Sequence, residues 1–154
     1  MRVPRFSLLQ CWTMHAARIL VIEDNEGDVN MLRFALDEQE EDYELEVLRD
    51  GEAAIQFIHE HRRAAREPEP CVILVDLHLP RYDGIAILRA IREAPPLEHI
   101  QVVVLSGRAN PREEAEIANL GAFYRTKPST LSELSELAAE IFVICNKSLP
   151  AISA

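Results

Sequence analysis

The sequence predicts an α/β fold in which a five-stranded parallel sheet carries helices on both faces. Five short strand-like runs alternate with five helical patterns along the 154 residues, and most of the joins between them are short. Apolar runs that are too short for a helix are typical of strands buried on both faces. Strands that alternate with helices form right-handed βαβ units. We therefore expect a doubly wound, flavodoxin-like (βα)5 domain with strand order 2-1-3-4-5.

Each predicted strand is recognised by an apolar or an alternating pattern. The central run, CVILVD, is mostly β-branched and ends in an acid. RILVIE and QVVVL are similarly apolar, whereas YELEVL alternates as a half-exposed edge strand does. In chain order, the predicted strands are residues 18–23, 43–48, 71–76, 101–105 and 122–126.

The predicted helices have apolar residues at helical spacing and recognisable starts. Asp50 can cap the second helix, and Asn110-Pro111 with Glu113 combines a cap, a proline at the first position and a capping box. Thr130 opens the last helix in a similar way. In chain order, the helices are expected over residues 25–39, the segment that follows Asp50, and residues 83–94, 110–120 and 130–147.

Composition limits the classes of function. The formal net charge is −10, which argues against a nucleic-acid-binding surface, because phosphate contacts need clustered Lys and Arg. We find no apolar stretch long enough to cross a membrane. Cys11, Cys71 and Cys145 form no CxxC pair, and we expect the last two to be buried thiols in a reducing cytosol.

The periodic pattern predicts one domain, which occupies residues 18–147. Residues 1–17 contain arginines and a short apolar run but no acid, and they lack the longer apolar region of a secretory signal. We expect a flexible arm or an extension there, and a short tail over residues 148–154.

Reactive side chains follow four of the predicted strands. Glu23 and Asp24 end the first strand, Asp76 ends the third, Ser106 follows the fourth and Lys127 follows the fifth. In this strand order the switch point lies between strands one and three, which carry the acids. Carboxylates gathered in one crevice repel one another, so they must either raise a pKa or bind a hard cation such as Mg²⁺. With a lysine and a hydroxyl beside it, such a pocket is suited to a phosphoryl group.

Four motifs, in order and each at a strand end, resemble the CheY-like receiver domain of two-component response regulators. They are Glu23-Asp24-Asn25, Asp76-Leu-His-Leu-Pro80 with Gly84, Leu105-Ser106, and Gly121-Ala-Phe-Tyr124-Arg-Thr-Lys127-Pro128. The resemblance covers about residues 18–147. The longer connection before the third strand and the tail Ser148-Leu149-Pro150 look like the stand-alone regulators that partner phytochrome histidine kinases.

The resemblance implies a phosphorelay site around Asp76. This residue would accept a phosphoryl group from the phosphohistidine of a sensor histidine kinase, which would be a bacteriophytochrome in the narrower match. Asp24, Glu23 through a water, Asp76 and the backbone carbonyl of His78 would hold Mg²⁺, which Mn²⁺ can replace. Lys127 would pair with the phosphoryl oxygens.

Further positions acquire roles by the same resemblance. Ser106 would donate its hydroxyl to the arriving phosphoryl group, and Tyr124 matches the aromatic residue that turns inward in the active state. The peptide before Pro128 would be cis, and Gly84 would be structural. The side chains of His78 and Arg108 would flank the path of the attacking water and tune the lifetime of the acyl phosphate.

The resulting expectation is a cytoplasmic, single-domain regulator that catalyses only its own phosphorylation and dephosphorylation. With no output domain in the 154 residues, we expect it to act on a downstream protein or a phosphotransfer partner. The last helix has more apolar residues than one buried face needs. We therefore expect Ile141, Phe142 and Ile144 to supply a homodimer interface.

Three other interpretations stay open at the level of the sequence. A phosphorylation-independent adaptor could share the fold, although it would leave the convergent groups unused. A flavin or nucleotide module needs a Gly/Ser/Thr-rich phosphate loop after the first strand, where this chain has Glu23-Asp24-Asn25-Glu26. A phosphatase with an aspartate nucleophile would want an acid two residues after Asp76, where His78 stands.

Overall fold

The computed structural model describes residues 16–63 and 69–148. Most of the expected arm over residues 1–17, most of the tail over residues 148–154, and Cys11 lie outside the described residues. Within the described part, none of the helices combines the length and the apolar character that are needed to cross a bilayer.

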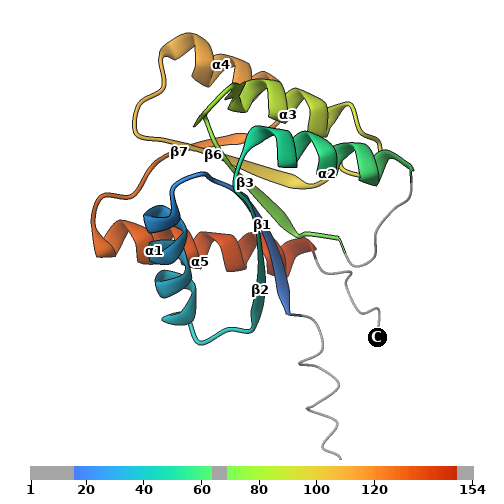
Figure 1. Cartoon of the computed structure of the whole chain (residues 1–154). Coiled ribbons are helices and arrows are strands. Elements are labelled where there is room, and N and C mark those ends of the chain that lie inside the picture. Colours follow the sequence, from blue (N-terminus) through green and yellow to red (C-terminus); the bar gives the residue numbers. More distant parts are fainter. Residues whose placement is uncertain (1–15, 64–68, 149–154) are drawn as a thin grey trace, which may run out of the picture.

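The centre of the molecule is a five-stranded parallel sheet (Figure 1). The strands lie in the order β2-β1-β3-β6-β7, and every neighbouring pair is parallel. Because β4 and β5 are two-residue strands outside this sheet, the order corresponds to the predicted 2-1-3-4-5, and the predicted fold class is confirmed. The strands are β1 (Ala17–Ile22), β2 (Tyr43–Leu48), β3 (Val72–Asp76), β6 (Gln101–Ser106) and β7 (Phe123–Thr126).

Helices cover both faces of the sheet, as Figure 1 shows. One face carries α2 (Gly51–Arg63), α3 (Gly84–Arg92) and α4 (Pro111–Asn119), and the other carries α1 (Glu26–Asp37) and α5 (Leu131–Ser148). The predicted caps are present. The Asp50 carboxylate accepts a hydrogen bond from the backbone N–H of Ala53 at 2.7 Å, and Asn110 forms the full capping box with Glu113.

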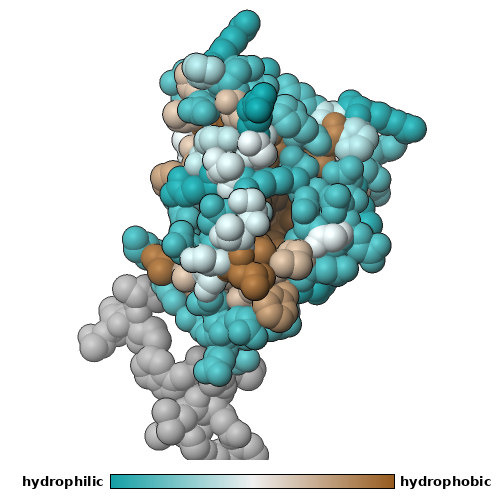
Figure 2. All heavy atoms as spheres, turned by 90° about the vertical axis from the view of Figure 1, so that its left-hand side faces the viewer, coloured by the Kyte–Doolittle hydropathy of each residue, from teal (hydrophilic) through white to brown (hydrophobic). Residues whose placement is uncertain are grey.

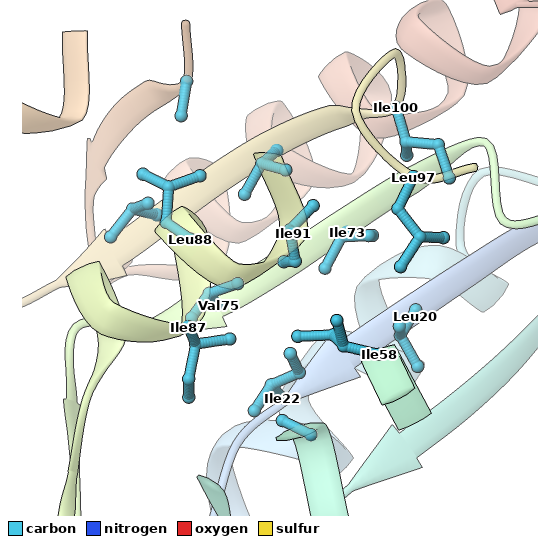
Figure 3. Packing of buried hydrophobic residues seen from close by; sticks show 14 of the residues in the cluster. Leu20, Ile22, Ile58, Ile73, Val75, Ile87, Leu88, Ile91, Leu97 and Ile100 are labelled. Atoms are coloured by element: carbon cyan, nitrogen blue, oxygen red, sulfur yellow. The ribbon is translucent and has the colours of Figure 1, made fainter. Parts of the chain in front are cut away.

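Alternate residues of the central strands enter two separate cores. Those facing α2, α3 and α4 pack as shown in Figure 3, among them Leu20, Ile22, Ile73 and Val75. Their neighbours along the strands, such as Leu74, pack against α1 and α5 instead. Burial on both faces explains why these strands are continuously apolar.

A small hairpin after β3 was not predicted. Strands β4 (His78–Leu79) and β5 (Tyr82–Asp83) pair in antiparallel fashion, with Arg81 in the left-handed region at φ 67°. Strands of two residues are too short to leave a periodic signal in the sequence. The hairpin leads directly into α3, because the Asp83 carboxylate caps that helix by accepting from the N–H of Ile85 at 3.0 Å.

Arg92, the last residue of α3, forms hydrogen bonds to two loops. Its guanidinium donates to the backbone carbonyls of Glu98 and Ile100 at 2.8 Å each, and to those of Leu120 and Gly121 at 2.7 and 3.1 Å. Burial lowers the pKa of this guanidinium, and the four carbonyls accept four of its five N–H donors. One side chain therefore joins the entrance of β6 to the end of α4.

Two expectations about the last helix and the cysteines are wrong. Cys71, just before β3, and Cys145, in the last turns of α5, form a disulfide, with their Cα atoms 5.0 Å apart, instead of two free thiols. Ile141 and Phe142 are 0% and 2% exposed because α5 packs them against the sheet, so they are not available to a partner chain. On this part of α5, the large exposed apolar residue is Val143. Homodimer formation itself stays a prediction.

Candidate phosphorylation and metal site

The carboxyl ends of β1, β3, β6 and β7 bring the predicted site residues to one edge of the sheet. Asp76 is the last residue of β3 and lies in register with Leu105 of β6, and Ser106 lies in register with Thr126, directly before Lys127. Glu23 follows β1, which pairs with β3 on its other side. Parallel register therefore gathers groups that are up to 104 residues apart in the chain.

Three carboxylates form an acidic cluster at this edge. Glu23, Asp24 and Asp76 each offer one oxygen, and these atoms lie within 4.8 Å of one another. Glu23 and Asp76 are only 5% and 6% exposed, whereas Asp24 faces solvent. The donor set consists of oxygens alone and has one open side, so the residues fit a hard divalent cation that keeps part of its water shell.

Two of these carboxylates are also held by backbone N–H groups. The Glu23 Oε1 atom accepts from the N–H of Asn25 at 3.0 Å, and the Asp76 Oδ1 atom accepts from the N–H of His78 at 3.0 Å. Each bond joins a residue to the second residue after it, so the turn after each strand fixes the orientation of the acid. The remaining oxygens point toward Lys127.

The Lys127 ammonium lies at the centre of a group of acids. Its Nζ atom is 3.0 Å from Asp76 Oδ2, 3.0 Å from Glu23 Oε2 and 3.0 Å from Asp28 Oδ2. Asp28 was not among the predicted site residues. Its only signal in the sequence is a position in the first turn of a helix, where acids are common because they interact favourably with the helix dipole.

The electrostatics of the site follow from this crowding. Burial raises the pKa of Glu23 to about 7, and the negative charge of Asp76 acts in the same direction. For Lys127, burial lowers the pKa, but hydrogen bonds to Asp28, Glu23 and Asp76 outweigh it and leave the pKa above its ordinary value. The lysine is therefore a permanent cation, while Glu23 changes its charge near neutral pH.

Ser106, Arg108, His78 and Tyr124 form a second group beside the acids. The Ser106 hydroxyl donates to the carbonyl of Arg108 at 2.9 Å and accepts from the N–H of Arg108 at 3.1 Å. The Nε2 atom of His78 lies 3.3 Å from the same carbonyl, and the Tyr124 hydroxyl donates to the carbonyl of Ser106 at 3.3 Å. This network holds the start of the β6–α4 loop.

Gly84 lies against the backbone at the end of β3. A Cβ atom at this position would lie 2.5 Å from the carbonyl oxygen of Asp76 and 2.7 Å from the Cα atom of Leu77. Only a glycine lets α3 begin this close to the backbone of the site. The glycine in the predicted motif thus has a steric reason that the sequence alone does not reveal.

Two clefts flank the acids. One, of about 550 Å³, lies between Asp24, the hairpin from His78 to Asp83, and Glu113. The other, of about 310 Å³, is an apolar groove between α1 and the start of α5, with Glu23, Asp28 and Lys127 at its edge. Figure 2 shows apolar side chains around a hollow on this side of the molecule. Pro128, predicted to follow a cis peptide, lines this groove.

Comparison with known proteins finds a family model and a relative that match most of this chain. Residues 19–139 match the family model of the response regulator receiver domain. The chain is 36% identical over 138 residues to the response regulator Rcp1 of Synechocystis sp., a match that covers 86% of this chain and 92% of that protein.

Two solved structures are similar in fold and sequence. The phosphorylated cyanobacterial phytochrome response regulator RcpA has a TM-score of 0.75 and 30% identity, covering 90% of this chain and 100% of that one. The Mn²⁺-bound form of Rcp1 has a TM-score of 0.73 and 34% identity, covering 88% and 99% respectively.

Proposed function

Since the chain belongs to the family of response regulator receiver domains, we propose that it is a phosphorelay protein that accepts a phosphoryl group on Asp76. Receiver domains are signalling proteins that take phosphoryl groups from histidine kinases and bind a divalent metal. The observation that carries the proposal is the 3.0 Å contact between the Lys127 ammonium and the buried Asp76 carboxylate, next to the acidic cluster.

In the transfer step, an oxygen of the Asp76 carboxylate attacks the phosphorus of a phosphohistidine. The new O–P bond forms as the P–N bond breaks. The electron pair of the P–N bond stays on the imidazole nitrogen, and the imidazole takes up a proton from solvent. Lys127 stabilises the negative charge on the phosphoryl oxygens as the group is transferred. The product is an acyl phosphate on Asp76, and a later attack of water returns the carboxylate and inorganic phosphate.

Mg²⁺ is the metal that we propose for the acidic cluster, with Mn²⁺ as a substitute. Asp24, Asp76 and the backbone carbonyl of His78 would hold it, and Glu23 would act through a water. The bound cation supplies charge neutralisation between the acids and the phosphoryl group. Burial of Glu23 and Asp76 supports this assignment, because buried carboxylates of like charge need compensating positive charge, and Lys127 supplies one charge for the three acids of the cluster.

Ser106 and Tyr124 are proposed as the switch. The Ser106 hydroxyl is engaged with the backbone of Arg108, so donating to a phosphoryl oxygen requires that it leave this bond. Such a rotation would loosen the start of the β6–α4 loop. Tyr124, whose hydroxyl is bonded to the carbonyl of Ser106, would respond to that change at the surface. His78 shares the Arg108 carbonyl and, with the Arg108 side chain, would tune the lifetime of the acyl phosphate.

A phytochrome histidine kinase is the partner that we propose, since RcpA is described as a phytochrome response regulator and resembles this chain over 90% of its length. We propose the cytoplasm as the place of this transfer. The output would be a change of surface that a downstream protein or a phosphotransfer partner recognises.

The test is intact mass after incubation with a small acyl-phosphate donor, with and without Mg²⁺, for the wild type and for Asp76→Asn. The proposal expects one phosphoryl adduct that requires both Mg²⁺ and Asp76. If the wild type gains no adduct under either condition, the chain is not a phosphoacceptor, and the adaptor interpretation would replace the proposal.

A further inference from the structure

The three contacts of Lys127 lead to an assignment for Asp28, which rests on the proposed function. We propose that Asp28 is a positioning residue that competes with the phosphoryl group for the Lys127 ammonium and so weakens the phosphorylated state. Asp28 belongs to α1, and it lies outside the acidic cluster formed by Glu23, Asp24 and Asp76.

The first step of the argument is the number of protons on the ammonium. A lysine Nζ atom has three hydrogens to donate. In the structure three carboxylate oxygens, from Glu23, Asp28 and Asp76, each lie 3.0 Å from it. The contacts with Asp28 and Asp76 are hydrogen bonds and the contact with Glu23 is an ion pair, so an arriving phosphoryl oxygen has to compete with three carboxylates for this ammonium.

The second step is the difference in exposure among the three acids. The side chains of Glu23 and Asp76 are 7% and 6% exposed, whereas the side chain of Asp28 is 49% exposed. A carboxylate released from an ion pair regains water at low cost only if solvent can reach it. The contact with Asp28 is therefore the one that breaks most easily.

The third step concerns charge. Asp28 adds a negative charge beside the position that a phosphoryl dianion would occupy, at the edge of the groove between α1 and α5. The start of α1 is capped by Asn25, whose side chain accepts from the backbone N–H of Asp28 at 3.0 Å, and this bond does not involve the Asp28 carboxylate. Removing the carboxylate should thus alter the site while the helix start is kept.

The chain offers a matched control. Glu26 is an exposed acid in the same first turn of α1, and it does not belong to the group around Lys127. Asp28→Asn and Glu26→Gln remove the same charge from neighbouring positions. Any effect that comes from net charge alone appears in both variants, whereas the competition for Lys127 appears only in Asp28→Asn.

The experiment measures the affinity of the full chain for beryllium trifluoride, a phosphoryl analogue, by calorimetry in saturating Mg²⁺. Exposed ion pairs are weak, so Asp28→Asn is expected to tighten binding by about two- to fivefold. The decay of the phosphoryl adduct, followed by intact mass, should slow in the same variant. Asp28→Glu should bind as the wild type does, and so should Glu26→Gln.

Two further variants separate this inference from the proposed function. If the wild type does not bind the analogue, or if Asp76→Asn binds it equally well, the proposed function fails and the inference fails with it. If the wild type binds normally but Asp28→Asn equals Glu26→Gln, or binds more weakly than the wild type, the inference alone is overturned. In a Lys127→Gln background, Asp28→Asn should lose its extra effect, because the group that it competes for is absent.

Discussion

Reduction of the Cys71–Cys145 disulfide is expected to lower the free energy of unfolding by about 4 kcal/mol. The two cysteines are 74 residues apart in the chain. For a closed loop of that size, the loss of chain entropy in the unfolded state is about 15 cal/mol/K, or roughly 4.5 kcal/mol at 298 K. Measured values tend to fall somewhat below this figure, because the unfolded chain is not a random coil.

The assay is urea unfolding followed by circular dichroism, with and without a phosphine reductant, in a Cys11→Ser background that removes the third cysteine. Reduction keeps every side-chain carbon and sulfur, so it isolates the effect of the cross-link from the effect of a cavity. A variant with both Cys71→Ala and Cys145→Ala should be insensitive to the reductant. A change smaller than about 1 kcal/mol on reduction would show that the cross-link does not constrain the unfolded chain as this reasoning requires.

Three other predictions concern Arg92, Gly84 at the start of α3, and the proposed metal site. Arg92→Met should lower the free energy of unfolding by about 3 kcal/mol, since four backbone carbonyls lose a charged donor. Urea unfolding measures this loss, and a loss below about 1 kcal/mol would contradict the prediction. Gly84→Ala should lower the free energy of unfolding by about 2–4 kcal/mol, because the added Cβ would collide with the backbone of Asp76. Gly107→Ala is the control: a Cβ there meets nothing within 4 Å, so the unfolding midpoint should change little. Because the pKa of Glu23 is raised to about 7, a proton competes with Mg²⁺ below that pH, so the Mg²⁺ affinity measured by calorimetry should rise about tenfold from pH 6 to pH 8. Glu23→Gln should flatten this rise, and an unchanged slope in that variant would assign the titration to another group.

The sheet and the edge where the acids meet could be predicted because both follow from local patterns. A continuously apolar strand such as β3 needs burial on both faces, and only a parallel sheet with helices on each side provides it. The residues that end such strands necessarily meet at one edge. The positions of Glu23, Asp76 and Lys127 therefore followed from strand order alone.

Features that depend on how distant side chains meet could not be predicted. Asp28 contacts a lysine 99 residues further along, and nothing in its own helix distinguishes it from other acids of a first turn. The disulfide depends on where the end of α5 comes to lie against β3. The burial of Phe142 depends in part on Tyr43, whose ring meets it edge-on with centroids 6.2 Å apart. An apolar stripe indicates that one side of a helix is buried, but the width of the stripe does not say how much of the stripe the sheet covers.

Helix α5 is capped at its start and cross-linked to another part of the chain near its end, and this difference bears on how the molecule can transmit motion. Near Lys127 the Glu133 carboxylate accepts from the N–H of Ser129 at 2.7 Å, while at the other end of the helix Cys145 is bonded to Cys71. Glu133 and Cys145 are 12 residues apart in the helix, a distance of about 18 Å.

A helix that is cross-linked near one end resists sliding along its axis. We therefore expect a displacement that begins at the carboxyl ends of the strands to reach α1 and the β6–α4 loop more than the end of α5. The disulfide joins the end of α5 to the residue before β3, so we expect this end to move least and to serve as a reference against which spectroscopic labels on those two elements can be measured.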